Sequence, residues 1–483
     1  MITSSAGVKG PPRSACSPVS IKTGEQPLFR VSLCVHGAEP FMRIRLLLPF
    51  VFLLVPLTSP AVPAEMPPNR RPAVPEVTAL EPELEALYRD LHEHPELAFH
   101  EERTAETLAK RVKELGFEVT TRVGGTGLVA IMRNGAGPVA MLRTELDALP
   151  IAEKTGLPFA SKATTRNAAG IVVPVAHACG HDLHMTGWYG AAKIMAQRRG
   201  AWHGTPMLVG QPAEETSSGA AAMLVDGLFT RFPKPDYAIS MHDEPSLRFG
   251  QIGFHAGFFR ASLDSVDVTI FGRGGHGARP QNTVDPVVIA ARVVLGIQTI
   301  VSRETDPFSP AVVTIGAIHG GTEGNIIPDE VRMQMTVRTY DAKVREHILA
   351  SIKRQVEAEA MAAAAPTMPV VKVAGGTDAV YNDPALTSRL VSALRRDLGA
   401  EAVREMPAKM TAEDFSQYGR AGVSAVLLHI GAVSPAALAS GEKLPDLHSP
   451  LWAPELQPTL DALVSAEVIM LMDLLGPQSP DAH

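Results

Sequence analysis

This chain contains few cysteines and has only a small net charge. Only 3 of the 483 residues are Cys, and the formal net charge is -7. A charge this mild provides neither a basic stripe for nucleic acid nor a polybasic patch for a membrane surface, so we expect neither partner. No internal repeat is visible. The length predicts two or three domains rather than one, and 45% hydrophobic with 20% charged residues is ordinary globular usage.

The chain also lacks an apolar run that would span a bilayer comfortably. Residues 46–57 (LLLPFVFLLVPL) are apolar but short, and Pro49 and Pro56 interrupt them. A basic segment beginning at Met42 precedes them, and small residues ending at Ala64 follow, which is the order of a secretory signal. We expect residues 1–64 to be an upstream segment and signal peptide cleaved near Ala64, with translation starting at Met42. An uncleaved anchor is the alternative.

Cleavage at that point would export the protein to the periplasm or the medium, without a stable membrane anchor. It would also remove two of the three cysteines. Cys16 and Cys34 lie upstream of the expected cleavage site, so Cys179 would be the single thiol of the mature chain. No internal disulfide is then possible, although the compartment is oxidising. A lone thiol in an exported enzyme suits a metal-bound thiolate better than a free one.

Two motifs in the middle of the chain combine residue types that bind metals. The first is His177-Ala178-Cys179-Gly180-His181-Asp182, and the second, directly after an apolar run, is Gln211-Pro212-Ala213-Glu214-Glu215. Thiolate and imidazole hold an ion, and a carboxylate that is not a ligand can transfer the proton in metal-assisted hydrolysis. In this order the two motifs predict a metallohydrolase.

The rest of the chain alternates short apolar runs with helical patterns. The expected strands are 139–142, 206–209, 236–240 and 424–430, and the expected helices are 185–197, 218–228, 384–398 and 455–475. Nearly continuous apolar strands between helices predict an α/β fold, with helices on both faces of the sheet. The candidate ligands follow strand ends, where such sheets form their sites. We assign 65–80 to a Pro-rich linker, and 81–261 with 375–477 to this domain.

A second domain interrupts the first at residues 262–374. Its expected elements are strand 266–271, helix 284–303, strands 311–318 and 331–338, helix 342–363 and strand 368–373. This β-α-β-β-α-β order is the ferredoxin-like α+β pattern.

Many ordered segments resemble the M20 family of metallopeptidases, in the amidohydrolase branch of hippurate hydrolases, N-acyl-amino-acid amidohydrolases and auxin-conjugate hydrolases. They run in family order from about residue 81 to the C-terminal helix. They are Leu91-His92-Glu93-His94-Pro95-Glu96-Leu97, Asp147-Ala148-Leu149-Pro150, the Cys179/His181 hexapeptide, the Glu214/Glu215 pair, Met241-His242, Gly274-Gly275-His276-Gly277-Ala278-Arg279-Pro280, Glu323-Gly324-Asn325-Ile326-Ile327-Pro328-Asp329, Val337-Arg338-Thr339, Glu413-Asp414-Phe415 and Leu447-His448-Ser449-Pro450.

The resemblance implies a zinc-peptidase-like mixed sheet and a site for two divalent ions. The implied ligands are Cys179, His181, Glu215, His242 and His448, with Cys179 bridging the ions. Glu214 matches the general base. Zn²⁺ or Mn²⁺ suits these ligands, and Co²⁺ or Ni²⁺ stays open.

The resemblance also implies roles for the inserted domain, as a lid and a dimerisation domain of a homodimer or higher homo-oligomer. His276 would stabilise the developing oxyanion, often from a partner subunit. Asn325 and Arg338 would hold the amide or carboxylate of the substrate, although Arg338 could instead pair only with Asp329 or Asp341.

The chain departs from the wider family at Glu145-Leu146-Asp147, where many members carry His-x-Asp. We expect Asp147 to orient a ligand, and the sequence leaves the role of Glu145 open. Four other histidines, His92, His94, His177 and His184, are expected to be structural.

Three functions fit these residues. The first is a metal-dependent amidohydrolase that cleaves N-acyl or N-aroyl amino acids. The second is an exported dipeptidase or carboxypeptidase of the same fold. The third is a non-catalytic binding protein, against which the complete set of ligands and base argues.

Overall fold

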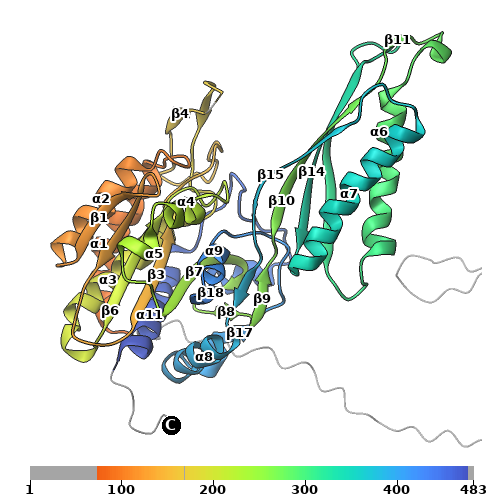
Figure 1. Ribbon diagram of the computed structural model, residues 1–483. Coiled ribbons are helices and arrows are strands. Elements are labelled where there is room, and N and C mark those ends of the chain that lie inside the picture. Colours follow the sequence, from red (N-terminus) through yellow and green to blue (C-terminus); the bar gives the residue numbers. More distant parts are fainter. Residues whose placement is uncertain (1–72, 168, 477–483) are drawn as a thin grey trace, which may run out of the picture. The chain divides into compact units, whose positions relative to one another are not determined.

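The computed structural model describes residues 73–167 and 169–476. Its largest element is an eight-stranded mixed sheet (Figure 1). The expected signal peptide, with Cys16 and Cys34, lies outside the described residues. In sheet order the strands are β1 (Glu118–Val123), β2 (Gly127–Ile131), β6 (Thr205–Gln211), β3 (Val139–Glu145), β7 (Tyr237–Arg248), β18 (Ser424–Val433), β8 (Ile252–Phe254) and β17 (Val403–Glu405).

The inner strands β6, β3, β7 and β18 run parallel, whereas β1, β2 and β8 form antiparallel pairs. Because parallel strands end at the same edge of a sheet, the residues that follow Glu145 and Gln211 emerge close together. The predicted mixed α/β sheet is therefore confirmed, and its carboxyl edge collects the candidate residues.

Helices cover both faces of this sheet, as expected. Leu142 of β3 packs into one core, and its neighbour Met141 packs into the other, because successive side chains of a strand point to opposite faces. The first core contains α1 (Glu76–Glu93), α2 (Glu102–Glu114), α3 (His181–Gln197), α8 (Pro384–Leu398) and α11 (Leu456–Leu475). The second core contains α4 (Gly219–Val225), α5 (Leu228–Arg231) and α9 (Ser416–Arg420).

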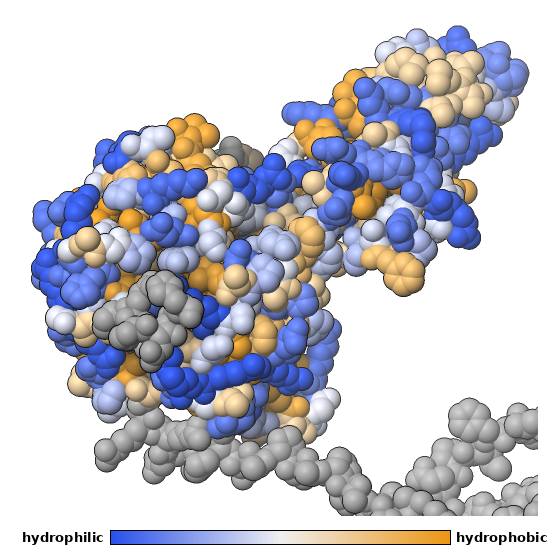
Figure 2. Space-filling model, turned by 60° about the horizontal axis from the view of Figure 1, so that its bottom comes forward, coloured by the Kyte–Doolittle hydropathy of each residue, from blue (hydrophilic) through white to orange (hydrophobic). Residues whose placement is uncertain are grey.

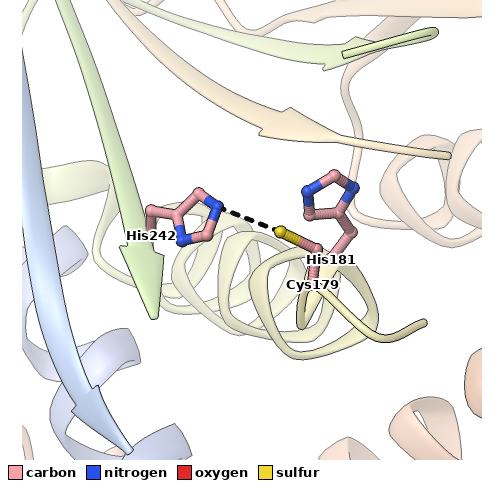
Figure 3. Close-up of side chains that lie close together, drawn as sticks. All are labelled: Cys179, His181 and His242. Carbon is pink, nitrogen blue, oxygen red and sulfur yellow. Dashed lines mark hydrogen bonds between the residues drawn. The ribbon is translucent and has the colours of Figure 1, made fainter. Parts of the chain in front are cut away.

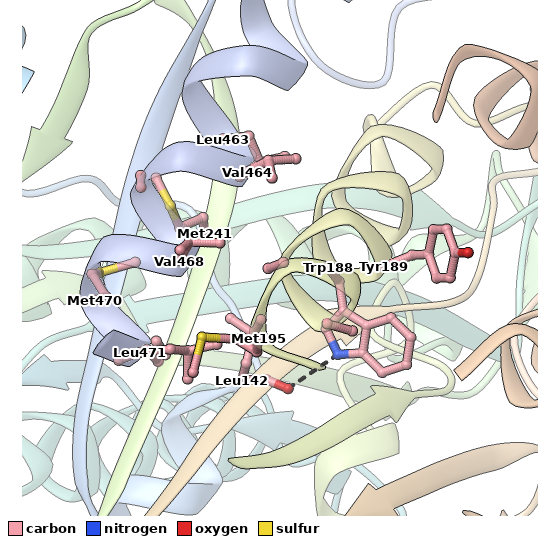
Figure 4. Close-up of a cluster of buried hydrophobic side chains, with 14 of the residues drawn as sticks. Leu142, Trp188, Tyr189, Met195, Met241, Leu463, Val464, Val468, Met470 and Leu471 are labelled. Carbon is pink, nitrogen blue, oxygen red and sulfur yellow. Dashed lines mark hydrogen bonds between the residues drawn. The ribbon is translucent and has the colours of Figure 1, made fainter. Parts of the chain in front are cut away.

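Helix α3 begins at the candidate ligand His181, two residues after Cys179, and packs against both the sheet and α11 (Figure 4). A Cβ at Gly187 would approach Leu463 Cδ2 to 2.4 Å, so glycine permits this close packing. Met185, Trp188 and Met195 are fully buried, and the Trp188 indole N–H donates to the Leu142 carbonyl at 3.2 Å. These three side chains are core residues, and they fix α3 against the sheet.

The inserted segment forms its own antiparallel sheet in the order β12 (Ala311–His319), β14 (Glu330–Thr339), β10 (Leu263–Phe271) and β15 (Val370–Thr377). Helices α6 (Pro286–Thr299) and α7 (Ala342–Ala362) share an apolar core with it. We call this the small-sheet unit. Its elements follow the expected β-α-β-β-α-β order, while the domain bounds and the lid and dimerisation roles stay predictions.

Several boundaries differ from the expectation. Helix α1 begins at Glu76, because Val77 and Leu80 continue its buried stripe despite Pro82, so the Pro-rich linker does not reach residue 80. The helix expected over 218–228 is two helices, because Gly227 adopts a left-handed φ of 91° between them. Strand β15 ends at Thr377, beyond the end of the strand expected over 368–373. Helix α3 begins one turn earlier than expected, at His181.

One described helix, Pro286–Glu304, could cross a membrane by length and composition alone. Its buried side chains Ile289, Val293 and Ile297 pack into the core of the small-sheet unit, so this is weak evidence for a span. On the face shown in Figure 2, hydrophilic residues surround small hydrophobic patches. That surface pattern is ordinary for a globular protein.

Candidate metal centre

Three predicted ligands meet at the start of α3 (Figure 3). Cys179 and His181 flank Gly180, and His242 comes from the neighbouring strand β7. The Cys179 Sγ atom lies 3.6 Å from His242 Nε2. All three side chains are buried, so their donor atoms face one another in a site shielded from bulk water.

Gly180 is required by the backbone and by the available space. Its φ is 76°, and a Cβ there would lie 2.4 Å from Asp243 Oδ2. Asp243 itself accepts a hydrogen bond from the Trp452 indole at 3.0 Å, and its carbonyl accepts from His242 Nδ1 at 2.9 Å. The glycine therefore lets the Cys179–His181 turn lie directly on the residue that orients His242.

The imidazole of His181 presents one nitrogen to the site. Its Nδ1–H donates to the Asp147 carbonyl at 2.8 Å, which leaves Nε2 as the lone-pair nitrogen of the neutral ring. That Nε2 is buried without a hydrogen bond and lies 3.8 Å from Glu214 Oε2 and 4.0 Å from Glu215 Oε1. A histidine oriented through Nδ1 with a free Nε2 has the arrangement of a metal ligand.

Asp147 also fixes the Glu pair. Its two carboxylate oxygens accept the backbone N–H groups of Glu214 at 3.1 Å and Glu215 at 2.9 Å. One residue thus orients His181 through its carbonyl and the Glu pair through its side chain. The expectation that Asp147 orients a ligand agrees with this geometry.

His448 approaches the same cluster from the loop after β18. Its backbone N–H donates to the Ala178 carbonyl at 2.7 Å, and it adopts a left-handed φ of 64°. Its Nε2 lies 3.3 Å from Glu215 Oε2. All five predicted ligands are therefore brought together, although His448 is half exposed while the others are largely buried.

These donors fit a pair of cations. Cys179 belongs to one group with His181 and His242, and to a second group with Glu215 and His448, each with donor atoms within 4.8 Å of one another. Burial raises the pKa of the Cys179 thiol well above its usual range and that of Glu215 to about 7. Both anions need a compensating positive charge, which a divalent ion supplies. The buried, unbonded Glu215 Oε1 and His181 Nε2 offer it two free lone pairs.

Glu145, whose role the sequence left open, lies beside the site and forms a donor group with His181 and His184 within 4.8 Å, but both of its oxygens already have partners. One oxygen pairs with Arg143 Nη1, and the other lies 3.1 Å from His184 Nδ1. Burial would raise the pKa of Glu145, but Arg143 and His184 hold it well below its usual range. Glu145 is thus an ionised partner of a buried arginine.

Sequence reasoning missed this arginine. Arg143 also donates to Glu413 at 2.8 Å and to Asp414 at 3.1 Å, so the Glu413-Asp414-Phe415 motif serves a buried ion network. A charged residue inside the apolar strand β3 was the available signal. The expected structural role of His92 agrees with its contacts, since its nitrogens lie 2.6 Å from Asp182 and 3.1 Å from Glu153.

The three remaining candidates lie on the small-sheet unit. His276 is in the short strand β11 (Gly275–His276), which pairs with β13 (Ile326–Ile327), so Asn325 is adjacent to it. Both residues are exposed, and neither contacts the Cys179 cluster in the described part of the chain. Arg338 donates to the Met410 carbonyl at 2.9 Å, so the expected alternative pairing with Asp329 or Asp341 is wrong.

Comparison with known proteins agrees with this geometry. Residues 141–447 match the model of peptidase family M20/M25/M40. The chain is 37% identical to N-acetyl-L-cysteine deacetylase of Bacillus subtilis over 71% of its length and 79% of the relative's. It is 40% identical to the hippurate hydrolase of Campylobacter jejuni over 56% of its length and 68% of the relative's.

A solved structure shares the fold as well. The YxeP protein of Bacillus subtilis, described as a dinuclear metal binding peptidase from the M20 family, is 29% identical, with a TM-score of 0.67 over 82% of this chain and 99% of that one. The chain therefore belongs to peptidase family M20/M25/M40, in its amidohydrolase branch, and is a hydrolase of amide C–N bonds that uses two divalent metal ions.

Proposed function

We propose that the enzyme cleaves N-acyl or N-aroyl amino acids into a carboxylic acid and a free amino acid. One observation carries the proposal: the buried carboxylate of Glu214 lies 3.8 Å from the free Nε2 of His181, beside five metal-ligating side chains. The named activities of two relatives, N-acetyl-L-cysteine deacetylase and hippurate hydrolase, support a small acyl-amino-acid substrate.

In this proposal Cys179, His181, Glu215, His242 and His448 hold the two ions. Cys179 would serve both ions, because its sulfur belongs to both donor groups. When bound, the ions polarise the scissile carbonyl and lower the pKa of water. Asp147 keeps His181 and the Glu pair in register with these ligands.

Glu214 is the general base. Burial, reinforced by the nearby carboxylates of Glu413 and Glu215, raises its pKa well above the usual value. A carboxylate with a high proton affinity takes the proton of the attacking water and later gives it to the leaving amine. Glu215 could not do so while it holds an ion, so the two adjacent residues would divide the two tasks.

The small-sheet unit supplies the remaining contacts in this proposal. His276 donates a hydrogen bond to the developing oxyanion. In a homodimer or higher homo-oligomer, the partner subunit would supply this histidine. Asn325 and Arg338 hold the substrate amide or carboxylate. The exposure of His276 and Asn325 and the partial exposure of Arg338 support such roles, because a residue that receives substrate must be accessible in the unliganded protein.

We also propose that the protein is exported. Support comes only from the signal-like order of residues 42–64, which lie outside the described residues. N-terminal sequencing of exported protein should find Glu65 or a near neighbour. An N-terminus at Ile2 or Arg43 would refute cleavage there.

Activity on a substrate panel tests the proposed reaction. The protein, loaded with Mn²⁺, Zn²⁺ or Co²⁺, is assayed on hippurate, N-acetyl amino acids and dipeptides, with and without chelator. We expect hydrolysis of acyl amino acids that chelation abolishes and added metal restores. A clear preference for dipeptides would replace the proposal with a peptidase, and no hydrolysis by metal-loaded protein would favour a binding protein.

A further inference from the structure

The loop that presents the Glu pair is fixed by two buried carboxylates. Three successive backbone N–H groups, those of Ala213, Glu214 and Glu215, donate to carboxylate oxygens. Ala213 N–H donates to Glu101 Oε1 at 2.8 Å, whereas the next two amides donate to Asp147 at 3.1 and 2.9 Å. The loop is therefore held from both ends of this short run.

Glu101 reaches this loop from a distant part of the chain. It precedes α2, is separated from Ala213 by 112 residues, and is fully buried. Its second oxygen accepts the Thr126 hydroxyl, so both oxygens are engaged. A buried carboxylate that touches neither a cation nor the metal cluster requires these hydrogen bonds to offset its desolvation. The Glu101 side chain therefore fixes the backbone of Ala213 through its hydrogen bond.

The backbone at Ala213 needs such support. Its φ is 52°, in the left-handed region that residues with a Cβ rarely adopt. A strained residue keeps its conformation only where its surroundings fix it, and strain of this kind gathers at functional sites. The next residue in the chain is Glu214, so the backbone turn at Ala213 sets the direction in which that side chain leaves.

We propose that Glu101 is a positioning residue for Glu214: its carboxylate fixes the left-handed turn at Ala213 and thereby aims the Glu214 carboxylate. This inference rests on the proposed function, since it assumes that Glu214 is the base. Asp147 still holds the amides of Glu214 and Glu215 when Glu101 is changed. Loss of Glu101 therefore affects proton transfer and leaves metal binding intact.

A pair of near-isosteric variants of the metal-loaded enzyme separates the hydrogen bond from packing. In Glu101→Gln the amide oxygen still accepts the Ala213 N–H, and its NH₂ group donates to Thr126. In Glu101→Met the volume is filled but the acceptor is lost. We expect Glu101→Met to lower kcat by about 10- to 100-fold, the usual cost of losing a residue that orients a site. KM and metal content stay unchanged, and Glu101→Gln recovers most of the rate.

Glu102→Ala is the matched control, because Glu102 is the next residue, begins α2 and is exposed, so its loss should leave kcat unchanged. Wild-type kcat in Glu101→Met, or a loss of kcat that follows loss of metal, would overturn the proposal. The same holds if Glu101→Gln is impaired as strongly as Glu101→Met. If Glu101→Met does not fold, Glu101→Gln becomes the deciding variant. Its kcat must then stay within about threefold of wild type, because a larger loss is expected only when the hydrogen-bond acceptor is missing.

The double variant with Glu214→Gln separates this inference from the proposed function. If Glu101 acts through Glu214, adding Glu101→Met to Glu214→Gln lowers kcat no further, because coupled residues are not additive. A full additional loss in the double variant would show that Glu101 acts elsewhere. Wild-type turnover in Glu214→Gln alone would instead refute the proposed role of Glu214, which is a different result.

Discussion

The carboxyl edge of the large sheet and the small-sheet unit both carry candidate site residues, but they hold them differently. At the sheet edge, His181, His242 and the Glu pair are oriented by hydrogen bonds that they donate to Asp147 and Asp243. In the small-sheet unit, the exposed ring of His276 has one hydrogen bond within the described part of the chain, in which Nδ1 accepts the Ala278 N–H at 3.1 Å. The candidate ligands at the sheet edge are preorganised, whereas His276 in the small-sheet unit is accessible to a substrate or a second protein.

This difference follows from the proposed roles, because the sheet-edge residues bind metal ions and the small-sheet residues contact substrate. Metal ligands must be fixed before an ion arrives, because small displacements weaken coordination and misplace the reacting water. Residues that contact substrate or a transition state gain their partners only during the reaction. Variants in the two regions should therefore fail in different ways, and the following predictions run from the largest expected effect to the smallest.

Glu214→Gln should have the largest effect. Removing a general base costs about 10²- to 10⁴-fold in rate, so kcat should fall by about 10³-fold while metal content is retained. The measurement is kcat together with metal analysis of the same sample. Persistence of wild-type turnover would remove Glu214 as the base.

His276→Ala should lower kcat by about 10²-fold, the cost of losing one oxyanion donor, without affecting thermal stability or metal content. Stability should hold because the side chain is exposed. His319→Ala, another exposed histidine of the same unit, is the control. If both variants behave alike, His276 has no special role and the small-sheet unit contributes no donor.

Arg338→Lys should raise KM about 10-fold with little change in kcat, because a hydrogen bond to a charged group is worth about 1.5–3 kcal/mol. Lys lacks the planar fork that binds a carboxylate at two points. Only Nη1 of Arg338 donates to Met410, so much of the guanidinium is free. An amide substrate without a free carboxylate is the comparison; an equal rise in its KM would contradict carboxylate recognition.

The smallest effect is on stability and concerns His92. Burial opposes its charge, but hydrogen bonds to Asp182 and Glu153 raise the pKa of His92 to about 10 in the folded protein, against about 6.5 when unfolded. Stability from this group is fully present below about pH 6.5 and lost as the pH rises through about 10. The Tm difference between wild type and His92→Gln should shrink over that window.

The exposed His94 gives the control for this pH dependence, because it offers only a surface contact with Asp90. His94→Gln should differ little from wild type at any pH. A Tm difference for His92→Gln that stays constant from pH 6 to 10 would show that His92 is not held protonated by Asp182 and Glu153.

Local signals predicted the large sheet, whereas the set of five candidate ligands came from the resemblance to the M20 family; the structure brings those five side chains together. Apolar runs mark the strands, and the polar residues directly after Glu145 and Gln211 share one edge. The bond from Glu101 to Ala213 was not predictable, since it joins residues 112 apart through a backbone N–H. The break at Gly227 was missed because the apolar pattern of 218–228 continues through it.

Arg143 shows the same limit in a buried network. Glu145 lies two residues away on the same strand, but Glu413 and Asp414 come from a distant segment, so only the folded chain shows why a strand interior tolerates this charge. For the same reason the sequence could not decide between Glu145 as a ligand and Glu145 as an ion-pair partner.

Metal content of purified wild type and Cys179→Ser tests the central claim most directly. If one sulfur joins both donor groups, the wild type should retain about two divalent ions per chain after gel filtration, as a binuclear site requires. Cys179→Ser should retain fewer than about one, because both ions lose a shared ligand. Cys179→Ser protein that still holds two ions with wild-type affinity would contradict the account.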